Sequence, residues 1–352
     1  MNATTSIPFL LGMFSSAGCR PFPGIVVDDR VVALHAIAAG VDGAALALSR
    51  SASLLDVLDC WDQYVGMLNA AAIGSTERNS VFHLHSTALG GLQVHAPLPE
   101  PRTIYCSGAN YKKHVVDLIV AHQEQPEAKD MSPEQKRDWG MKLMDQRAAT
   151  GTPFIFIKPQ SSVVGPAAPI VVPRDARKPD WELELAVVIG RRARRVARER
   201  ALDYVAGYTI VNDITVREKV FRRKADSPEL GMDFTVSKGA PSFLPMGPYL
   251  VPAAFVPDPQ QLRLKLRLNG RVMQDESTSD MIFTVAHLIE YLSASVELRP
   301  GDVICTGSPA GNGMHYGRFI EDGDLLESDI ASASLHFGTQ RNPCTAETSG
   351  SV

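Results

Sequence analysis

The 352-residue chain lacks three features that would assign it to a specialised class of protein. Its formal net charge of -4 argues against a polyanion such as nucleic acid as a partner of the whole chain. Its five cysteines are scattered and include no Cys-x-x-Cys pair, so we expect reduced thiols rather than a disulfide framework. No apolar run approaches the roughly 18 residues that span a bilayer, and the N-terminus lacks a signal-peptide pattern. We therefore expect a cytoplasmic protein without a membrane partner.

The composition that remains is that of a globular protein large enough for two domains. Residues 1–97 indicate a small α+β domain, with a hairpin about Asp28-Asp29 and a helix capped by Ser53. We find no catalytic pattern there and assign this part a role in packing or dimerisation. A proline-rich link leads to a larger domain over 98–338, and we expect 339–352 to be a disordered tail.

The most informative stretch runs from Asp180 to Gly190, where two carboxylates interrupt a typical buried strand. Side chains alternate along a strand, so Glu182 and Glu184 share one face. Burying two like charges side by side is unfavourable unless a cation lies between them, and a solvent-facing edge strand is the alternative. Asp213 is set among apolar residues of a second β-rich run, and this third acid favours a bound cation over an exposed edge strand. Three carboxylates suit Mg²⁺, Mn²⁺ or Ca²⁺.

A strand, a glycine-containing loop and a helix follow the proline-rich link, and His114 falls at the start of this helix. Such loops often carry catalytic side chains, although a surface histidine is the alternative. The polar segment 118–150 comes next, with a helix start at Ser132. Beside a candidate site this segment is either a lid that closes over substrate or a surface insertion.

Three other segments have clear local patterns. Apolar and basic residues alternate over 262–268 and Asn269-Gly270 suits a type I′ turn, which predicts a half-buried β-hairpin. A strand near 303 opens into a glycine-rich loop whose N–H groups can approach an anionic ligand. Six arginines between 191 and 200 have no interleaved aromatic residues, so we expect a turn and a solvated helix start rather than a nucleic-acid site.

Six motifs, in this order, resemble those of the fumarylacetoacetate hydrolase family. They are Asn110-Tyr111-Lys112-Lys113-His114, Phe156-Ile157-Lys158-Pro159, Asp180-Trp181-Glu182-Leu183-Glu184-Leu185-Ala186, Asn212-Asp213-Ile214-Thr215-Val216-Arg217, Ser237-Lys238-Gly239 and Gly301-Asp302-Val303-Ile304-Cys305-Thr306-Gly307-Ser308-Pro309-Ala310-Gly311. The resemblance implies an α+β, mainly β fold: a mixed β-sheet roll around a divalent metal, usually Mg²⁺. It also implies a homodimer.

The resemblance assigns roles to individual residues. The metal ligands would be Glu182, Glu184 and Asp213. The base would be His114, and Lys238 would support the substrate enolate. Some members have a further acidic ligand where this chain has Ser107, so we expect three protein ligands.

Other assignments stay open at this level. The acidic partner of the base, expected on the lid, is Glu124, Glu127 or Glu134. The expected substrate contacts are Tyr111, Arg217, Gly307 and Ser308, and Arg217 either anchors a carboxylate or pairs with a neighbouring acid. The chain departs from the family after Lys238, where Ala240-Pro241 replaces the usual residues, and near Val220, where a glutamine is common.

The resemblance and the residue chemistry together favour a hydrolase of carbon–carbon bonds. The substrate would be a diketo acid, an acylpyruvate or a relative of fumarylacetoacetate, in the breakdown of aromatic compounds or sugar acids. The same site also suits a decarboxylase, tautomerase, isomerase or hydratase of a 2-oxo acid. A non-catalytic binding protein with this fold is the alternative from another class.

Overall fold

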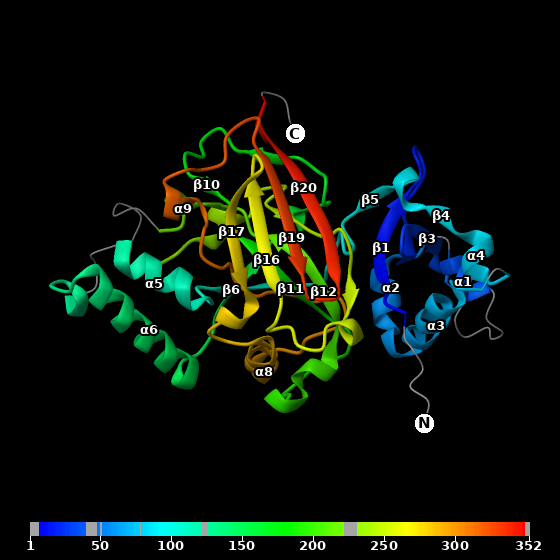
Figure 1. Cartoon of the computed structure of the whole chain (residues 1–352), viewed down its shortest axis with the longest axis horizontal. Helices are drawn as coiled ribbons and strands as arrows, with labels where there is room; N and C mark the ends of the chain where they lie inside the picture. Colours follow the sequence, from blue (N-terminus) through cyan, green and yellow to red (C-terminus); the bar gives the residue numbers. More distant parts are fainter. Residues whose placement is uncertain are drawn as a thin grey trace.

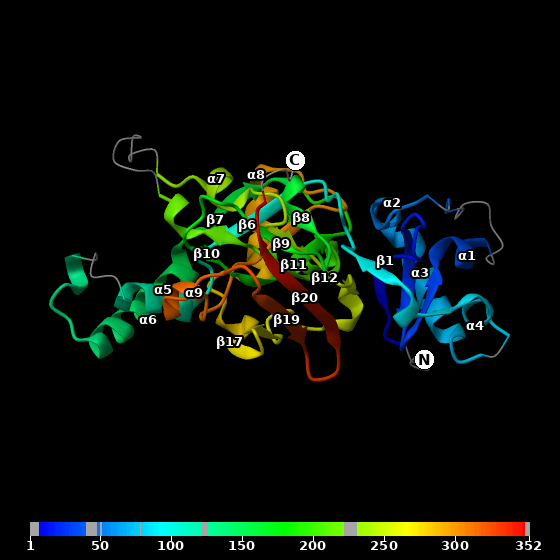
Figure 2. The ribbon, with the colours of Figure 1, turned by 90° about the horizontal axis from the view of Figure 1, so that it is seen from above.

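Figure 1 shows the computed structural model of the chain. It describes residues 7–39, 48–49, 51–77, 79–121, 126–221 and 231–348. A small N-terminal unit lies at one end, the two large sheets occupy the middle, and helices α5 (Lys112–Ala121) and α6 (Pro133–Thr150) lie at the other end (Figures 1 and 2). Within the described residues, no helix is long and apolar enough to cross a bilayer.

The N-terminal unit is a five-stranded sheet covered by helices. The strand order is β4-β3-β2-β1-β5. Its elements are β1 (Leu10–Ser15), β2 (Phe22–Val27), β3 (Arg30–Ala33), α1 (Leu34–Ala39), α2 (Leu54–Asp59), α3 (Trp61–Gly74), α4 (Val81–His85), β4 (Thr87–Ala88) and β5 (Gln93–His95). The predicted hairpin is confirmed, with β2 and β3 paired and Asp28 at a φ of 51°. Ser53 caps a helix as expected, but that helix ends at Asp59 and α3 begins after Cys60.

The larger unit contains two mixed sheets. The first has the order β15-β12-β11-β18-β6-β7 and the second β17-β16-β19-β20-β9. The strands of the first are β6 (Ile104–Gly108), β7 (Phe154–Lys158), β11 (Leu183–Ile189), β12 (Val205–Asn212), β15 (Val251–Pro252) and β18 (Val303–Cys305). Those of the second are β9 (Ile170–Val172), β16 (Arg263–Leu268), β17 (Arg271–Ser277), β19 (Leu325–Ala331) and β20 (His336–Ala346). The predicted α+β fold with mixed sheets is confirmed.

Strand β11 connects two hydrophobic cores because it is buried on both faces. Its odd-numbered side chains, such as Leu185 and Val187, pack in a core that includes Leu264 of the second sheet. Its even-numbered side chains Ala186 and Val188 pack in a core shared with the N-terminal unit. Alternation therefore places Glu184 on the same face as Ala186, where the second core ends.

Two further local predictions are confirmed. The hairpin is confirmed: β16 pairs with β17, and Asn269 and Gly270 have φ values of 51° and 80°, as a type I′ turn requires. Ser132 and Gln135 form the predicted capping box of α6. Helix α8 (Val285–Ser295) follows the hairpin.

The prediction of a disordered tail over 339–352 is wrong for most of its length. Strand β20 runs to Ala346, antiparallel to β19 and parallel to β9. Two of its inward side chains are amides, which hid the alternation from hydrophobicity alone. Gln340 Nε2 donates to Ile210 O at 2.9 Å and Asn342 Nδ2 donates to Ala168 O at 2.8 Å, so backbone carbonyls accept from both buried amide nitrogens.

The arginine-rich segment packs by ion pairs. Arg191 pairs with Asp62 of α3, and Arg198, which begins the 3₁₀ helix η5 (Arg198–Tyr204), pairs with Glu290 of α8. These contacts agree with the predicted turn and solvated helix start.

Gly207 of β12 allows a close approach by β15, since a Cβ there would lie 2.3 Å from Val251 O. We expect Gly207→Ala to lower the free energy of unfolding by about 1–3 kcal/mol through overpacking. Gly66 of α3 is the matched control, because a Cβ there meets no atom within 4 Å. Gly66→Ala should raise the free energy by about 0.5–1 kcal/mol through helix propensity. Urea unfolding measures both, and equal effects would contradict the expectation.

Candidate active site

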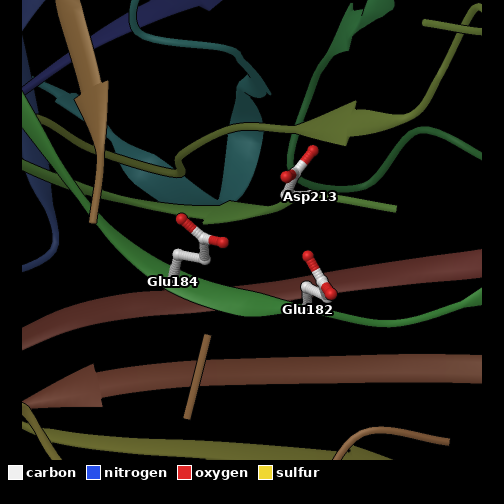
Figure 3. A group of neighbouring side chains, drawn as sticks. All are labelled: Glu182, Glu184 and Asp213. Carbon is white, nitrogen blue, oxygen red and sulfur yellow. The ribbon is translucent and has the colours of Figure 1, made fainter. Parts of the chain in front are cut away.

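Three carboxylates gather where β11 and β12 meet (Figure 3). Glu182 immediately precedes β11, Glu184 lies within it, and Asp213 immediately follows β12. Each offers an oxygen within 4.8 Å of the others, and all three side chains are buried. The strand alternation and the second β-rich run therefore predicted this group correctly.

Strand pairing fixes the positions of these carboxylates. Leu183 of β11 lies opposite Asn212 of β12. The Asn212 side chain accepts a hydrogen bond from Glu182 N at 2.8 Å, and Asp213 N donates to Glu182 O at 2.8 Å. Backbone pairing and these two hydrogen bonds therefore hold the three acidic residues next to one another.

Two buried lysines and the partly buried Arg217 form ion pairs with these carboxylates and with Asp180. Lys238, at the end of α7 (Phe234–Lys238), lies 2.6 Å from both Glu182 Oε2 and Asp213 Oδ2. Lys158, the last residue of β7, lies 2.6 Å from Asp213 Oδ1. Arg217 bridges Glu182 at 2.6 Å and Asp180 at 2.7 Å.

Glu184 is the exception among these acids. Its Oε2 accepts a hydrogen bond from Gly307 N at 2.7 Å, and none of the ion pairs found in the described part of the chain includes it. Burial, reinforced by the negative charge of Asp213, raises the pKa of Glu184 well above its usual value. Although burial alone would raise it, Arg217 and Lys238 lower the pKa of Glu182 to about 2.

The charge balance fits a divalent cation. When all four carboxyl groups are ionised they outnumber the three neighbouring cations by one, and Glu184 is the acid without an ion pair among the described residues. Oxygen ligands of this kind suit hard divalent ions. Glu182, Glu184 and Asp213 are the residues that would hold the ion.

His114 lies in the first turn of α5 and is buried. Burial and the charge of Arg217 lower the pKa of His114 to about 3, so its ring is neutral at neutral pH. Its Nδ1 is buried and has no hydrogen-bond partner in the described structure. A neutral imidazole with a free ring nitrogen can accept a proton.

Neither of the two described candidates for the acidic partner of His114 lies beside it. Glu127 and Glu134 are exposed and do not line the cavity at His114, while Glu124 lies outside the described residues. The ring of His315 lies beside that of His114, with the two centroids 5.4 Å apart. The 118–150 segment contains α6, which packs on α5 through Gly140 and Val116; its role as a lid stays a prediction.

A cavity of about 480 Å³ unites these groups. It is lined by the three carboxylates together with Ser107, His114, Arg217, Lys238, Ser308 and Asn312, and by apolar side chains. Several polar atoms in its wall are buried without a hydrogen-bond partner in the described residues: Ser107 Oγ, Arg217 Nη2 and Asn312 Nδ2. Unpaired donors of this kind are suited to an oxygen-rich anionic ligand.

The other predicted substrate contacts lie in different places. Ser308 lines the cavity, and its Oγ accepts a hydrogen bond from Gln274 at 3.0 Å. Gly307 does not line the cavity, and its N–H donates to Glu184. Tyr111 is fully buried in the core and does not line the cavity, which assigns it to packing. Arg217 pairs with neighbouring acids and keeps one buried nitrogen unpaired.

Sequence reasoning missed two charged residues of the site. The side chain of Lys158 is completely buried and pairs with Asp213. The sequence pattern that could have indicated this burial is a single lysine at the end of an apolar strand. Asp180 accepts hydrogen bonds from the N–H groups of Gly313 and Met314 as well as from Arg217. Its partners lie far away in sequence, so only the fold reveals this role.

Comparison with known proteins identifies the class to which this site belongs. Residues 103–345 match the family model described as the C-terminal domain of fumarylacetoacetate (FAA) hydrolase. The chain belongs to the fumarylacetoacetate hydrolase family.

Individual relatives show how far the likeness extends. An uncharacterized protein of Pyrococcus abyssi is 46% identical over 189 residues, which are 52% of this chain and 82% of that protein. Maleylpyruvate hydrolase from Sphingobium sp. SYK-6, solved with manganese(II) and pyruvate, has a TM-score of 0.68 at 25% identity, covering 96% of this chain and 100% of that one. A 2-hydroxyhepta-2,4-diene-1,7-dioate isomerase from Mycobacterium marinum has a TM-score of 0.60 at 26% identity, covering 97% and 100%.

Glu184→Gln tests the metal assignment with little disturbance to the fold, because the amide keeps the shape and can still accept from Gly307 N–H. We expect Mn²⁺ at about 100 times its dissociation constant to stabilise the wild type by about 2.7 kcal/mol and the variant by much less. Thermal unfolding with Mn²⁺ or EDTA measures this difference. Glu127→Gln, at an exposed site outside the cavity, is the control and should behave as wild type. Equal stabilisation of Glu184→Gln and wild type would contradict the assignment.

Proposed function

We propose that this protein is a divalent-metal-dependent hydrolase that cleaves a carbon–carbon bond in a diketo acid of the acylpyruvate type. The observation that carries the proposal is one cavity that holds three buried carboxylates, a neutral buried histidine and unpaired hydrogen-bond donors. The likeness to a maleylpyruvate hydrolase solved with manganese(II) and pyruvate supports it. We propose Mg²⁺ or Mn²⁺ as the ion.

A divalent ion at Glu182, Glu184 and Asp213 would polarise a substrate carbonyl as a Lewis acid. Arg217 Nη2 and Asn312 Nδ2 are unpaired donors in the cavity wall, so they are suited to hold the substrate carboxylate. These contacts would orient the diketo acid before any bond breaks.

His114 would act as the general base. Its neutral ring accepts a proton from a water molecule while the water oxygen bonds to the distal carbonyl carbon. The carbon–carbon bond then breaks, its electron pair goes to the fragment that retains the 2-oxo acid, and that fragment takes up a proton. Lys238 lines the same cavity, and its positive charge would stabilise the negative charge that develops on this fragment when the bond breaks.

An isomerase is the second candidate, favoured by the likeness to the M. marinum dioate isomerase. Isomerisation moves a proton between two positions of one substrate and requires no water in the bond-breaking step. The two reactions use the same base and differ in their products. Hydrolysis gives two acids from one, whereas isomerisation conserves the substrate's mass.

His114→Asn tests the proposal. With acylpyruvates and Mn²⁺, the loss of diketo-enolate ultraviolet absorbance should slow by about 10²–10⁴-fold in kcat, because the base is removed. Mass spectrometry of the products separates hydrolysis from isomerisation. The control is His83→Asn, an exposed histidine on α4 that should keep wild-type activity. A product of unchanged mass would favour the isomerase, and no turnover of any diketo acid or 2-oxo acid would favour a binding protein.

The homodimer expected from the family resemblance is a further part of the proposal. Strand β7 is the last strand of its sheet, and its Phe154 and Ile157 are 40% and 62% exposed. Such an apolar edge supports association with a second copy. Sedimentation velocity should show a dimer for wild type and a larger monomer fraction for Ile157→Arg; a wild-type monomer would contradict this.

A further inference from the structure

The short helix α9 (Gly313–Tyr316) lies beside α5, and Asn312, directly before it, lines the cavity (Figures 1 and 2). An asparagine in this position commonly caps the helix with its own side chain. The Asn312 side chain makes no such bond. Asp180 accepts hydrogen bonds from Gly313 N and Met314 N in its place. The amide of Asn312 is therefore available for other contacts.

The amide of Asn312 bonds instead to a histidine within α9. His315 Nδ1 lies 2.6 Å from Asn312 Oδ1. An amide oxygen can only accept a hydrogen bond, so His315 Nδ1 is the donor. The other end of the amide, Nδ2, is buried and has no hydrogen-bond partner in the part of the chain that the structure describes. Because His315 does not line the cavity, this bond turns Oδ1 away from the cavity and leaves Nδ2 available to a ligand.

The ring of His315 lies between α9 and α5. Its Nε2 is 3.6 Å from Asp117 Oδ2, and its centroid is 5.4 Å from that of His114. The side chain of His315 is only 15% exposed. Two routes therefore lead from His315 to the site, one through the amide of Asn312 and one through the ring of His114.

The contacts favour the route through Asn312. Asn312 shares a hydrogen bond with His315, whereas Nδ1 of His114 has no hydrogen-bond partner among the described residues. The two histidine rings, with their planes at 45°, are in packing contact. Such a contact does not select one end of a polar group, but a hydrogen bond to an amide oxygen does.

The backbone that carries His315 is anchored without its ring. Trp181 Nε1 donates to Gly311 O at 3.0 Å, and Tyr316 Oη donates to Met273 O at 2.8 Å. Together with the capping carboxylate, these bonds hold the segment on both sides of the histidine. Loss of the His315 side chain should therefore free the neighbouring amide while the segment keeps its place.

We propose that His315 is a positioning residue for the substrate: it holds the amide of Asn312 with Nδ2 toward the cavity, where Nδ2 donates to the substrate carboxylate. The inference rests on the proposed function, which supplies a 2-oxo acid as the ligand. An amide that can rotate presents its oxygen as well as its nitrogen, and the oxygen cannot donate to a carboxylate. An amide that is fixed before the ligand arrives also avoids the cost of ordering it on binding.

Calorimetric binding of pyruvate in the presence of Mn²⁺ tests the proposal without turnover. We expect His315→Leu to weaken pyruvate binding by about three- to tenfold, the effect of one hydrogen bond. His315→Asn should bind like the wild type, because its side-chain nitrogen can still donate to Asn312 Oδ1. His83→Leu, at an exposed site on α4, is the control and should have no effect. Wild-type affinity in His315→Leu would overturn the proposal, and so would the failure of the wild type to bind pyruvate.

A double-mutant cycle shows whether the effect passes through Asn312. We expect Asn312→Ala alone to weaken pyruvate binding by about tenfold or more, because a hydrogen bond to a charged group is lost. In that background His315→Leu should change the affinity by less than about twofold. An equal loss in both backgrounds would overturn the proposal, since it would place the effect in His114 or in the fold.

Two further measurements separate positioning from a structural role. Mn²⁺ should stabilise His315→Leu against thermal unfolding as much as the wild type, because the ion would be held by Glu182, Glu184 and Asp213. With an acylpyruvate substrate, the variant should raise KM more than it lowers kcat, because the carboxylate contact is made both before and during bond cleavage. Loss of the Mn²⁺ effect, or a fall in kcat alone, would overturn the proposal.

The binding measurements are independent of catalysis. If the variants bind pyruvate as expected but no diketo acid is cleaved, the proposed function fails and the role of His315 holds. If acylpyruvates are cleaved while His315→Leu binds pyruvate like the wild type, the proposed function holds and this inference fails.

Discussion

The buried charge cluster at the end of β11 is the constraint on which the rest of the site depends. Isolated carboxylates are too costly to bury, so each requires a cation or several donors. Lys158, Arg217 and Lys238 come from three different elements, and each must reach the same small region for the acids to remain buried. Charge compensation of the carboxylates therefore requires the edge strand β7, the 3₁₀ turn that begins at Arg217 and helix α7 to pack around the same site.

The sequence predicted the parts of this arrangement that depend on short-range patterns. Alternation within one strand identified Glu182 and Glu184, and a typical turn identified the hairpin at Asn269-Gly270. The family resemblance added His114, which does lie in the cavity. What the sequence could not reveal are pairings between distant residues. Asp180 and its partners at 313 and 314 are an example, because their register depends on how separate elements pack.

The wrong predictions have a common physical origin. Tyr111 stands three residues before His114 in the sequence, yet its ring fills the core. The C-terminal stretch was expected to be a disordered tail, yet the amide nitrogens of Gln340 and Asn342 in β20 donate to backbone carbonyls inside the protein. In both cases the burial depends on distant elements that pack around the residue, which the local sequence does not show. A polar side chain can be buried wherever the fold supplies a partner or a large apolar surface.

The position of β20 has a consequence for the order in which the protein assembles during synthesis. The sheet of the N-terminal unit is complete once His95 has been added. The second large sheet lacks the link between β19 and β9 until the ribosome has added Ala346. Domains fold from the N-terminus as the chain emerges. The larger unit therefore cannot complete its second sheet until β20 has been synthesised. Strands β11 and β12, which flank the acidic cluster, are synthesised much earlier.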